Sequence, residues 1–279
     1  MIKTLYLEKV DKPKFLFQKI KIEQDNCKIY ANLEKEKNIK KMVSKIAKTD
    51  VNAVVLSKEL KVNSQLINEL NSANIHIFDG RWLEKYLTYE ILEFILRQKN
   101  QEKEETELAI TTNEITDSCI QIIKTLAKQY KRVTVVTNHL NKLRKIEKEL
   151  YDEYGILILI SNNQKKSLAK AQLILNMDFN KEVLNKYKIN ENAIILNWEG
   201  DIIIYNKRFN GLNVNNYEIE VGREEIIWRT NMKEFETKEL LESALYMKDT
   251  FDNIRDKIGK YKVFIKELYG INGKIERFY

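Results

Sequence analysis

The stretch that decides the fold is residues 108–161, LAITTNEITDSCIQIIKTLAKQYKRVTVVTNHLNKLRKIEKELYDEYGILILIS. Three short apolar runs in it (LAIT, RVTVVT and ILILIS) predict strands covered by helices on both sheet faces. Between the strands, 117–130 and 140–154 place their apolar residues on one helical face, and Gly155 is suited to end the second helix. Right-handed strand–helix–strand units of this length form a doubly wound parallel sheet.

Further elements follow on the C-terminal side. Two more apolar runs predict strands, and Gly211 with several Asn residues separates two strand-like runs that predict a β-hairpin or paired edge strands. In the last predicted helix the apolar residues recur at alternating spacings of four and three, which predicts docking on its own chain, with a homodimer as the alternative. These elements are a helix at 165–171, strands at 172–176 and 193–197, hairpin strands at 201–205 and 217–221, and a long helix at 234–258.

The N-terminal part predicts a second, smaller α/β domain. Its strands alternate with helices, which favours an at least partly parallel sheet. The charged run QKNQEKEETE at 98–107 is the predicted linker, although it could equally extend the preceding helix. The predicted domains are 1–100, 107–205 and 206–279. The N-terminal strands are expected at 4–10, 15–21, 28–33, 51–57 and 74–78, and the helices at 38–48, at 60–71 and in a long segment that carries Leu83, Leu87, Ile91 and Ile95.

Composition excludes several function classes. The net charge is +7, of which residues 1–100 contribute +6. No apolar run approaches the roughly 20 residues of a membrane span, and charge interrupts the first residues too early for a secretory signal. Cys27 and Cys119 are far apart, which suggests neither a disulfide framework nor a zinc site. With only His76 and His139 available, no histidine-based triad can be assigned, and a cytoplasmic protein is predicted.

Two local sequences are similar to a known class of dinucleotide-binding domain. Thr137-Asn138-His139 is followed by Arg144, and AQLILN at 171–176 is a strand that ends in Asn176. Together with the element order over 108–176, they resemble the nucleotide-binding domain of shikimate dehydrogenase-like and glutamyl-tRNA reductase-like proteins. The resemblance implies NADP as cofactor, with Asn138, His139 and Arg144 near the adenosine 2′-phosphate and Asn176 beside the nicotinamide.

The loop after the first of these strands departs from that family. Its sequence, TTNEITD at 111–117, lacks the glycines that let a backbone approach a pyrophosphate. Glu114 and Asp117 would also repel a phosphate, and Thr116 or Asp117 is better explained as a helix N-cap. No catalytic residue and no metal ligand can be assigned. The candidate cofactor-binding residues are Thr111, Thr112, Asn113, Asn138, His139, Arg144 and Asn176.

Two further features have a structural and a functional interpretation. Asp79-Gly80-Arg81-Trp82 lies where a strand ends and a helix begins, and a tight turn is favoured over a ligand site. Four lysines on one helix face could meet nucleic acid, but no aromatic residue interleaves with them, so a solvated face is favoured and nucleic acid is disfavoured as a partner. They are Lys37, Lys41, Lys45 and Lys48.

The sequence therefore predicts an α/β protein: a small N-terminal α/β domain, a Rossmann-like doubly wound domain and a long C-terminal helix. The first hypothesis for its function is a vestigial dinucleotide site, without catalysis, and a role in interaction or ligand sensing. The alternative is an NADP-dependent oxidoreductase of the shikimate dehydrogenase-like type, and the further alternative is a nucleic-acid-associated protein. The partner, a small molecule or a protein, is not identified.

Overall fold

The structure is a computed structural model in which the chain forms two compact units. One consists of Met1–Tyr86 and Glu220–Phe264, and the other of Leu87–Ile219 and Ile265–Tyr279. This division does not test the domain boundaries predicted from the sequence, which stay predictions. Across the part of the chain that the structure describes, no helix is long and apolar enough to cross a membrane. The described residues are 3–9, 20–23, 26–29, 33, 35–198, 200–222, 233–246 and 249–278.

The second unit contains a six-stranded parallel sheet in the order β11-β10-β9-β6-β7-β8. Counted along the chain from β6, this order is 3-2-1-4-5-6 when read from β8, which is the Rossmann order. The α/β, Rossmann-like fold class predicted from the sequence is therefore confirmed. The strands are β6 (Glu107–Thr111), β7 (Arg132–Val136), β8 (Ile158–Ser161), β9 (Leu173–Asn176), β10 (Ile194–Asn197) and β11 (Leu212–Val214).

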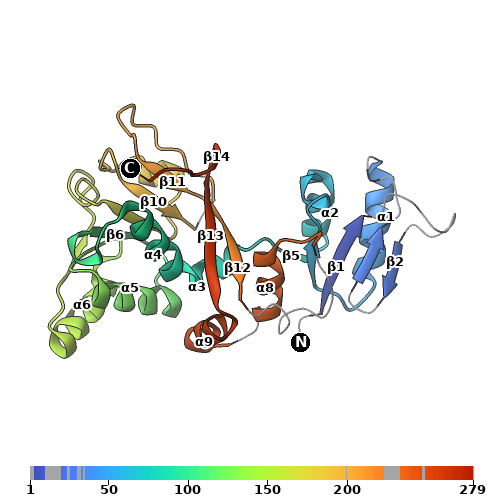
Figure 1. The fold of residues 1–279 in the computed structure, drawn as a ribbon, viewed down its shortest axis with the longest axis horizontal. Coiled ribbons are helices and arrows are strands. Elements are labelled where there is room, and N and C mark those ends of the chain that lie inside the picture. Colours follow the sequence, from blue (N-terminus) through green and yellow to red (C-terminus); the bar gives the residue numbers. More distant parts are fainter. Residues whose placement is uncertain are drawn as a thin grey trace. The chain divides into compact units, whose positions relative to one another are not determined.

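Helices connect these strands, and their ends follow local capping rules. The Thr116 hydroxyl accepts a hydrogen bond from the Cys119 amide at the start of α5. Helix α6 ends at Gly155, whose φ of 66° is readily adopted only by glycine. Figure 1 shows α5 and α6 close together on this unit. The helices of the unit are α4 (Thr88–Lys99), α5 (Asp117–Gln129), α6 (Leu140–Tyr154) and the short α7 (Lys181–Leu184).

The first unit contains a five-stranded sheet in the order β2-β3-β1-β4-β5. All pairs are parallel except β2 with β3, which is antiparallel. The predicted, at least partly parallel N-terminal sheet is thus confirmed. Residues 15–19 of the strand predicted at 15–21 lie outside the described residues. The strands are β1 (Thr4–Lys9), β2 (Ile20–Glu23), β3 (Asn26–Ile29), β4 (Ala53–Leu56) and β5 (His76–Phe78).

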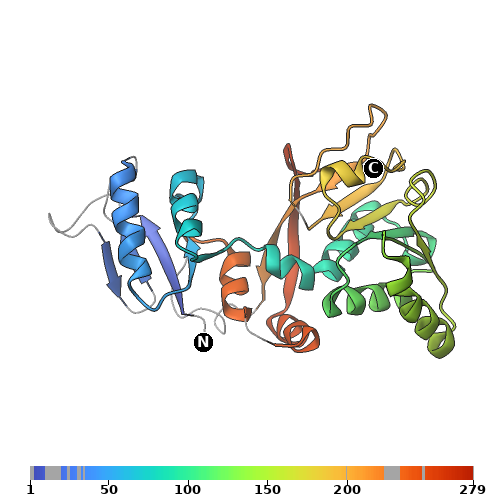
Figure 2. The same ribbon diagram turned by 180° about the vertical axis from the view of Figure 1, so that it is seen from behind.

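Strand β4 shows how this sheet is covered on both faces. Val54 and Leu56 belong to the core beneath α1 and α2, whereas Ala53 and Val55 belong to the core that includes Leu240 of α8. Successive side chains of a strand point to opposite faces, so a run buried on both faces is continuously apolar. Figures 1 and 2 show α1, α2 and α8 around this sheet. The helices are α1 (Glu36–Ala47), α2 (Ser64–Ser72), α3 (Arg81–Tyr86), α8 (Thr237–Leu245) and α9 (Phe251–Tyr261).

The C-terminal part differs from the prediction in two respects. The expected single helix at 234–258 consists of α8 and α9, because Thr250 caps a new helix through the Asn253 amide. The expected hairpin does not form, since residues 201–205 are irregular and β11 joins β10 in parallel. Strand β12 instead belongs to a three-stranded sheet, order β12-β13-β14. Its strands are β12 (Asn216–Val221), β13 (Val263–Gly270) and β14 (Gly273–Lys274).

Three smaller predictions were also wrong. The long helix expected after Gly80 is interrupted at Leu87, so α3 and α4 are separate helices. Residues 164–170 form turns rather than a helix, and a 3-10 turn at Leu60–Val62 precedes α2. In the last two cases side chains hydrogen-bond to nearby amides: Asn63 caps α2, which therefore begins at Ser64, and Asn163 accepts from the Lys165 and Lys166 amides, which favours a turn there.

Candidate functional site at the switch point of the Rossmann sheet

The candidate site lies between β6 and β9, where the strand order of the sheet reverses. The chain moves outward in one direction from β6 through β7 to β8, and in the other direction from β9 through β10 to β11. Connections on the two sides therefore diverge at the carboxyl ends of β6 and β9, and open α/β sheets bind their ligands at that point. The loop at 112–116 follows β6, and residues 177–180 follow β9.

A row of buried polar side chains spans these strand ends. Thr111 donates to Oδ1 of Asn176 at 2.6 Å, and Nδ2 of Asn176 donates to Oδ1 of Asn197 at 3.1 Å. Asn197 in turn donates to Asn215 at 2.9 Å. Thr111 and Asn176 are register partners, as are Asn176 and Asn197, so the row crosses the sheet at one level.

Asn176 lies at the centre of this row, and its amide has further partners. Its Nδ2 also donates to the Phe179 carbonyl at 2.9 Å, and its Oδ1 accepts from the Phe179 amide at 3.1 Å. Thr111, Asn176 and Asn197 are completely buried. Buried polar groups that are hydrogen-bonded rigidify their surroundings, so Thr111, Asn176 and Asn197 hold the ends of three neighbouring strands and the turn after β9. At the end of the row, Asn215 accepts from Asn197, but its own buried Nδ2 has no hydrogen-bond partner among the described residues.

Asp178 follows β9, and its carboxylate binds the loop after β6. It accepts hydrogen bonds from the Asn113 amide at 2.7 and 2.8 Å, from the Glu114 amide at 2.5 Å and from the Thr112 hydroxyl at 3.0 Å. Backbone amides before a helix N-terminus are the groups that bind an anion in this fold. Here an acidic side chain from the neighbouring strand end is the anion that they bind.

A second link joins this loop to the end of β7. The Asn113 side-chain oxygen accepts from the Asn138 amide at 3.0 Å, and the Thr137 hydroxyl accepts from the His139 amide at 3.0 Å. Asn138 and His139 are exposed just after β7, where the resemblance places the adenosine 2′-phosphate. Asn113 therefore joins the loop after β6 to the loop after β7.

The structure brings most of the sequence-predicted candidates to one edge of the sheet. Arg144 is exposed in the second turn of α6, with no hydrogen bond to the others among the described residues. Asp178 was missed, and its position directly after the strand that ends in Asn176 was the only signal in the sequence that could have indicated it. The assignment of all seven residues to a cofactor stays a prediction: Thr111, Thr112, Asn113, Asn138, His139, Arg144 and Asn176.

The corresponding strand-to-helix loop of the first unit has the same kind of arrangement. Between β5 and α3, the Glu242 carboxylate accepts from the Gly80 amide at 2.6 Å, from the Trp82 amide at 2.9 Å and from the Leu83 amide at 3.3 Å. Gly80 has φ of +88°, and a Cβ there would lie 2.8 Å from the Lys238 side chain. The positive φ, together with this close approach, explains the glycine in the Asp79–Trp82 segment as part of a tight turn.

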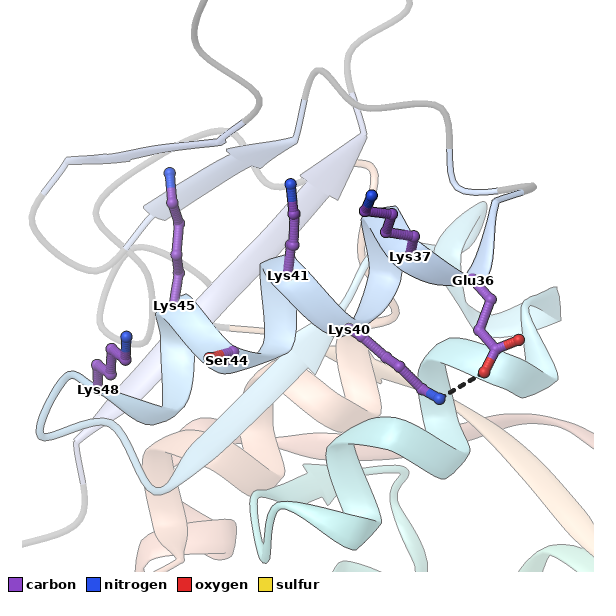
Figure 3. Close-up of a pocket in the computed structure, with 7 residues that line it drawn as sticks. All are labelled: Glu36, Lys37, Lys40, Lys41, Ser44, Lys45 and Lys48. Atoms are coloured by element: carbon purple, nitrogen blue, oxygen red, sulfur yellow. Dashed lines mark ion pairs between the residues drawn. The ribbon is translucent and has the colours of Figure 1, made fainter.

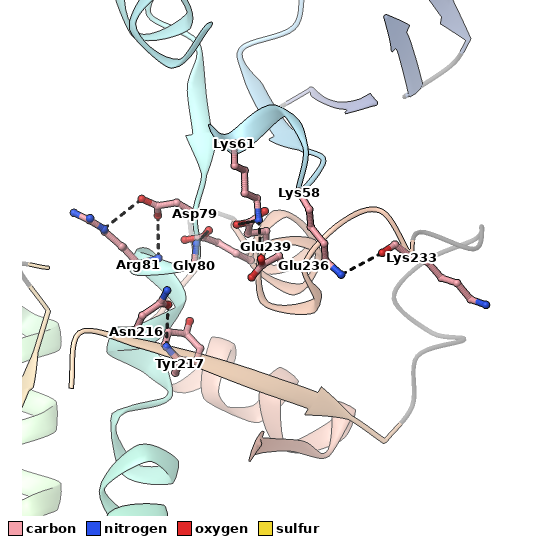
Figure 4. Close-up of polar contacts among 11 residues, drawn as sticks. Lys58, Lys61, Asp79, Gly80, Arg81, Asn216, Tyr217, Lys233, Glu236 and Glu239 are labelled. Atoms are coloured by element: carbon pink, nitrogen blue, oxygen red, sulfur yellow. Dashed lines mark hydrogen bonds and ion pairs between the residues drawn. The ribbon is translucent and has the colours of Figure 1, made fainter. Parts of the chain in front are cut away.

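Further acidic groups are buried around this loop. Lys61 forms ion pairs with Glu239 and, at 3.5 Å, with Glu236, and it points toward both in Figure 4. Burial raises the pKa of Glu239 and of Glu242 to about 7, although Lys61 and the backbone amides respectively act against the shift. Burial raises the pKa of Glu84 to about 8 against the opposing charge of Lys238. None of the described residues forms an acidic, histidine or cysteine group that could hold a metal ion.

The chain was compared with protein families, curated proteins and solved structures. No protein-family model and no curated protein matches the chain. Shikimate 5-dehydrogenase from Listeria monocytogenes, solved with shikimate and NAD, is similar with TM-score 0.36 and 11% identity, covering 92% of this chain and 96% of that one. D-mandelate dehydrogenase from Rhodotorula graminis is similar with TM-score 0.35 and 11% identity, covering 75% of this chain and 77% of that one.

In a third solved structure, the match covers a smaller share of the known protein. L-tryptophan dehydrogenase from Nostoc punctiforme is similar over 67% of this chain, with TM-score 0.31 and 8% identity. The chain spans only 52% of that enzyme. The strand order by itself defines the fold as Rossmann-like. The likeness to these Rossmann-type dehydrogenases is weak.

Proposed function

We propose that this chain is a Rossmann-like protein with a vestigial dinucleotide site, and that it acts through interaction or ligand sensing without hydride transfer. The observation that carries the proposal is the Asp178 carboxylate, which takes the hydrogen bonds of the Asn113 and Glu114 amides and of the Thr112 hydroxyl. In a functional dinucleotide site such donors bind the pyrophosphate.

Electrostatics supports the proposal independently of hydrogen bonding. A pyrophosphate at this loop would lie within a few ångströms of the Asp178 carboxylate, and two like charges 4 Å apart repel by about 4 kcal/mol at an effective dielectric constant near 20. Glu114 and Asp117 belong to the same loop and helix start and are exposed. Their charges add to the repulsion and weaken the attraction of the helix N-terminus for an anion.

One observation favours the alternative, an NADP-dependent oxidoreductase. Asn138 and His139 are exposed at the end of β7, and no acidic residue ends that strand. An acidic residue there would bind the ribose 2′-hydroxyl of NAD, so its absence is compatible with the 2′-phosphate of NADP. The oxidoreductase would require Asp178 to leave the loop when the cofactor binds.

Titration calorimetry with NADPH and NADH tests the proposal. We expect no saturable binding by the unmodified chain at nucleotide concentrations up to about 1 mM. A dissociation constant of that size corresponds to a binding free energy of about −4 kcal/mol. Asp178→Ala should permit weak binding of either nucleotide by freeing the loop donors. Asp152→Asn, which removes the same charge from an exposed position on α6, is the control and should change nothing.

The opposite result is equally specific. A dissociation constant in the low micromolar range for the unmodified chain, weakened by Asn138→Ala or Arg144→Ala, would contradict the vestigial site. It would support the oxidoreductase instead.

A further inference from the structure

One face of α1 carries a row of exposed cations, which we call the lysine face: Lys37, Lys41, Lys45 and Lys48. The opposite face of the helix is buried in the first unit through Ile39, Met42, Val43 and Ile46. The helix is therefore fixed to its sheet, and the lysines belong to a rigid element. In Figure 3 the side chains of Lys41 and Lys45 extend in parallel from the helix, and the Lys37 ammonium lies on the same side.

Ion pairing distinguishes the lysine face from the neighbouring Lys40. The Lys40 ammonium lies 2.5 Å from Glu36 and 3.8 Å from Glu69, so two carboxylates neutralise it. Within the described ranges, none of the four lysines of the lysine face forms an ion pair. This face therefore carries unpaired charges of one sign within the described ranges, whereas a face evolved only for solubility commonly mixes both signs.

The spacing of the lysine face suits a ligand with repeated charges. At 1.5 Å per residue, successive lysines lie about 4.5–6 Å apart along the axis, and Lys37 and Lys48 about 16 Å apart. A hollow of about 780 Å³ lies along them, lined also by Glu36, Lys40 and Ser44. Duplex DNA rises 3.4 Å per base pair, so the face would cover about five base pairs of backbone.

The composition of the face narrows the class of ligand. Single-stranded nucleic acid is bound through stacking on aromatic side chains, and α1 contains none. Stable binding to a membrane surface needs inserted apolar side chains or a lipid anchor beside a basic patch, and every large apolar residue of α1 is buried. A row of cations alone makes backbone contacts, and those contacts carry no sequence information.

We propose that the lysine face binds the phosphate backbone of duplex nucleic acid without reading its sequence. The spacing of the lysines alone favours a solvated face, but their lack of ion pairs to any described residue favours an anionic ligand. The lysine face belongs to the first unit and shares no residue with the site at Asp178, so the two can be tested independently.

Fluorescence anisotropy with a labelled DNA duplex of about 20 base pairs provides the test. Four lysine–phosphate contacts predict a slope of about −3.6 for the logarithm of the binding constant against that of the salt concentration. Binding should then weaken about 150-fold between 50 and 200 mM salt. Lys41→Gln with Lys45→Gln should halve the slope. The matched control is Lys145→Gln with Lys148→Gln, exposed lysines of α6, which should leave the slope unchanged.

Two further ligands separate the alternatives, and circular dichroism confirms that each variant is folded. A single strand of equal charge and polyglutamate of equal charge should both bind more weakly than the duplex. Absence of duplex binding at 50 mM salt, equal loss of slope in the control variant, or equal affinity for polyglutamate would each overturn the proposal. The last result would indicate an acidic protein as the partner.

Discussion

Removal of the Glu242 carboxylate is predicted to destabilise the first unit strongly. Glu242 is 1% exposed, and it accepts the amides of Gly80, Trp82 and Leu83 at the start of α3. An unsatisfied buried donor costs about 1–3 kcal/mol. The amides of Gly80 and Leu83 are in buried hydrogen bonds, so Glu242→Ala should lower the free energy of unfolding by about 2–6 kcal/mol.

A second substitution divides this effect between the two oxygens. Glu242→Gln keeps one oxygen, which can still accept from Trp82 and Leu83, and places an NH2 group against the Gly80 amide. Only one acceptor is then lost, and we expect a loss of about 1–3 kcal/mol. Asp256→Ala is the control, because Asp256 is an exposed acidic residue on α9 of the same unit.

Urea unfolding followed by circular dichroism measures the change in midpoint, and hydrogen exchange localises it. The amides at 80–83 should exchange faster in both Glu242 variants, and their exchange rates should be unchanged in Asp256→Ala. If Glu242→Ala unfolds within about 0.5 kcal/mol of the unmodified chain, the range of ordinary surface substitutions, then the carboxylate does not hold this loop.

Three other predictions concern pH, the polar row and α9. Burial raises the folded-state pKa of Glu84 to about 8 and that of Glu239 and Glu242 to about 7, above the unfolded value of about 4.3. The free energy of unfolding should therefore be highest near pH 4–5 and fall as the pH rises to 8. Thermal melts should show this fall, and Glu84→Gln should make it smaller. Asn176→Ala should lower the free energy of unfolding by about 2–4 kcal/mol in urea titrations, because it leaves Thr111, Asn197 and Phe179 without their partner. Phe251→Ala removes a half-buried ring stacked 5.2 Å from Tyr86, so light scattering should show unchanged mass while stability falls by about 1–2 kcal/mol.

The sequence by itself determined the local elements and the class of fold. The continuous apolar runs at β6, β7, β9 and β10 and the helical periodicity of α5 and α6 act over a few residues, as do Thr116 and Gly155 at helix ends. Such signals depend on φ, ψ and hydrogen bonds between near neighbours, which is why the predicted bounds agree closely with the structure there. Where a cap at Thr250 competed with a longer apolar periodicity, the cap decided the outcome and the prediction of one long helix was wrong.

Only the tertiary structure decided how the loops after the strands are filled. Asp178 accepts a hydrogen bond from Asn113, which lies 65 residues away in the sequence, and Glu242 accepts one from Gly80, which lies 162 residues away. No local propensity encodes such a pair, because its hydrogen bonds gain free energy only after the sheet and its helices have packed and excluded water. The missing glycines already indicated that the loop after β6 is unusual for a dinucleotide. The acid that takes the place of the phosphate became visible only with the fold, because parallel strand order brings the ends of β6 and β9 together.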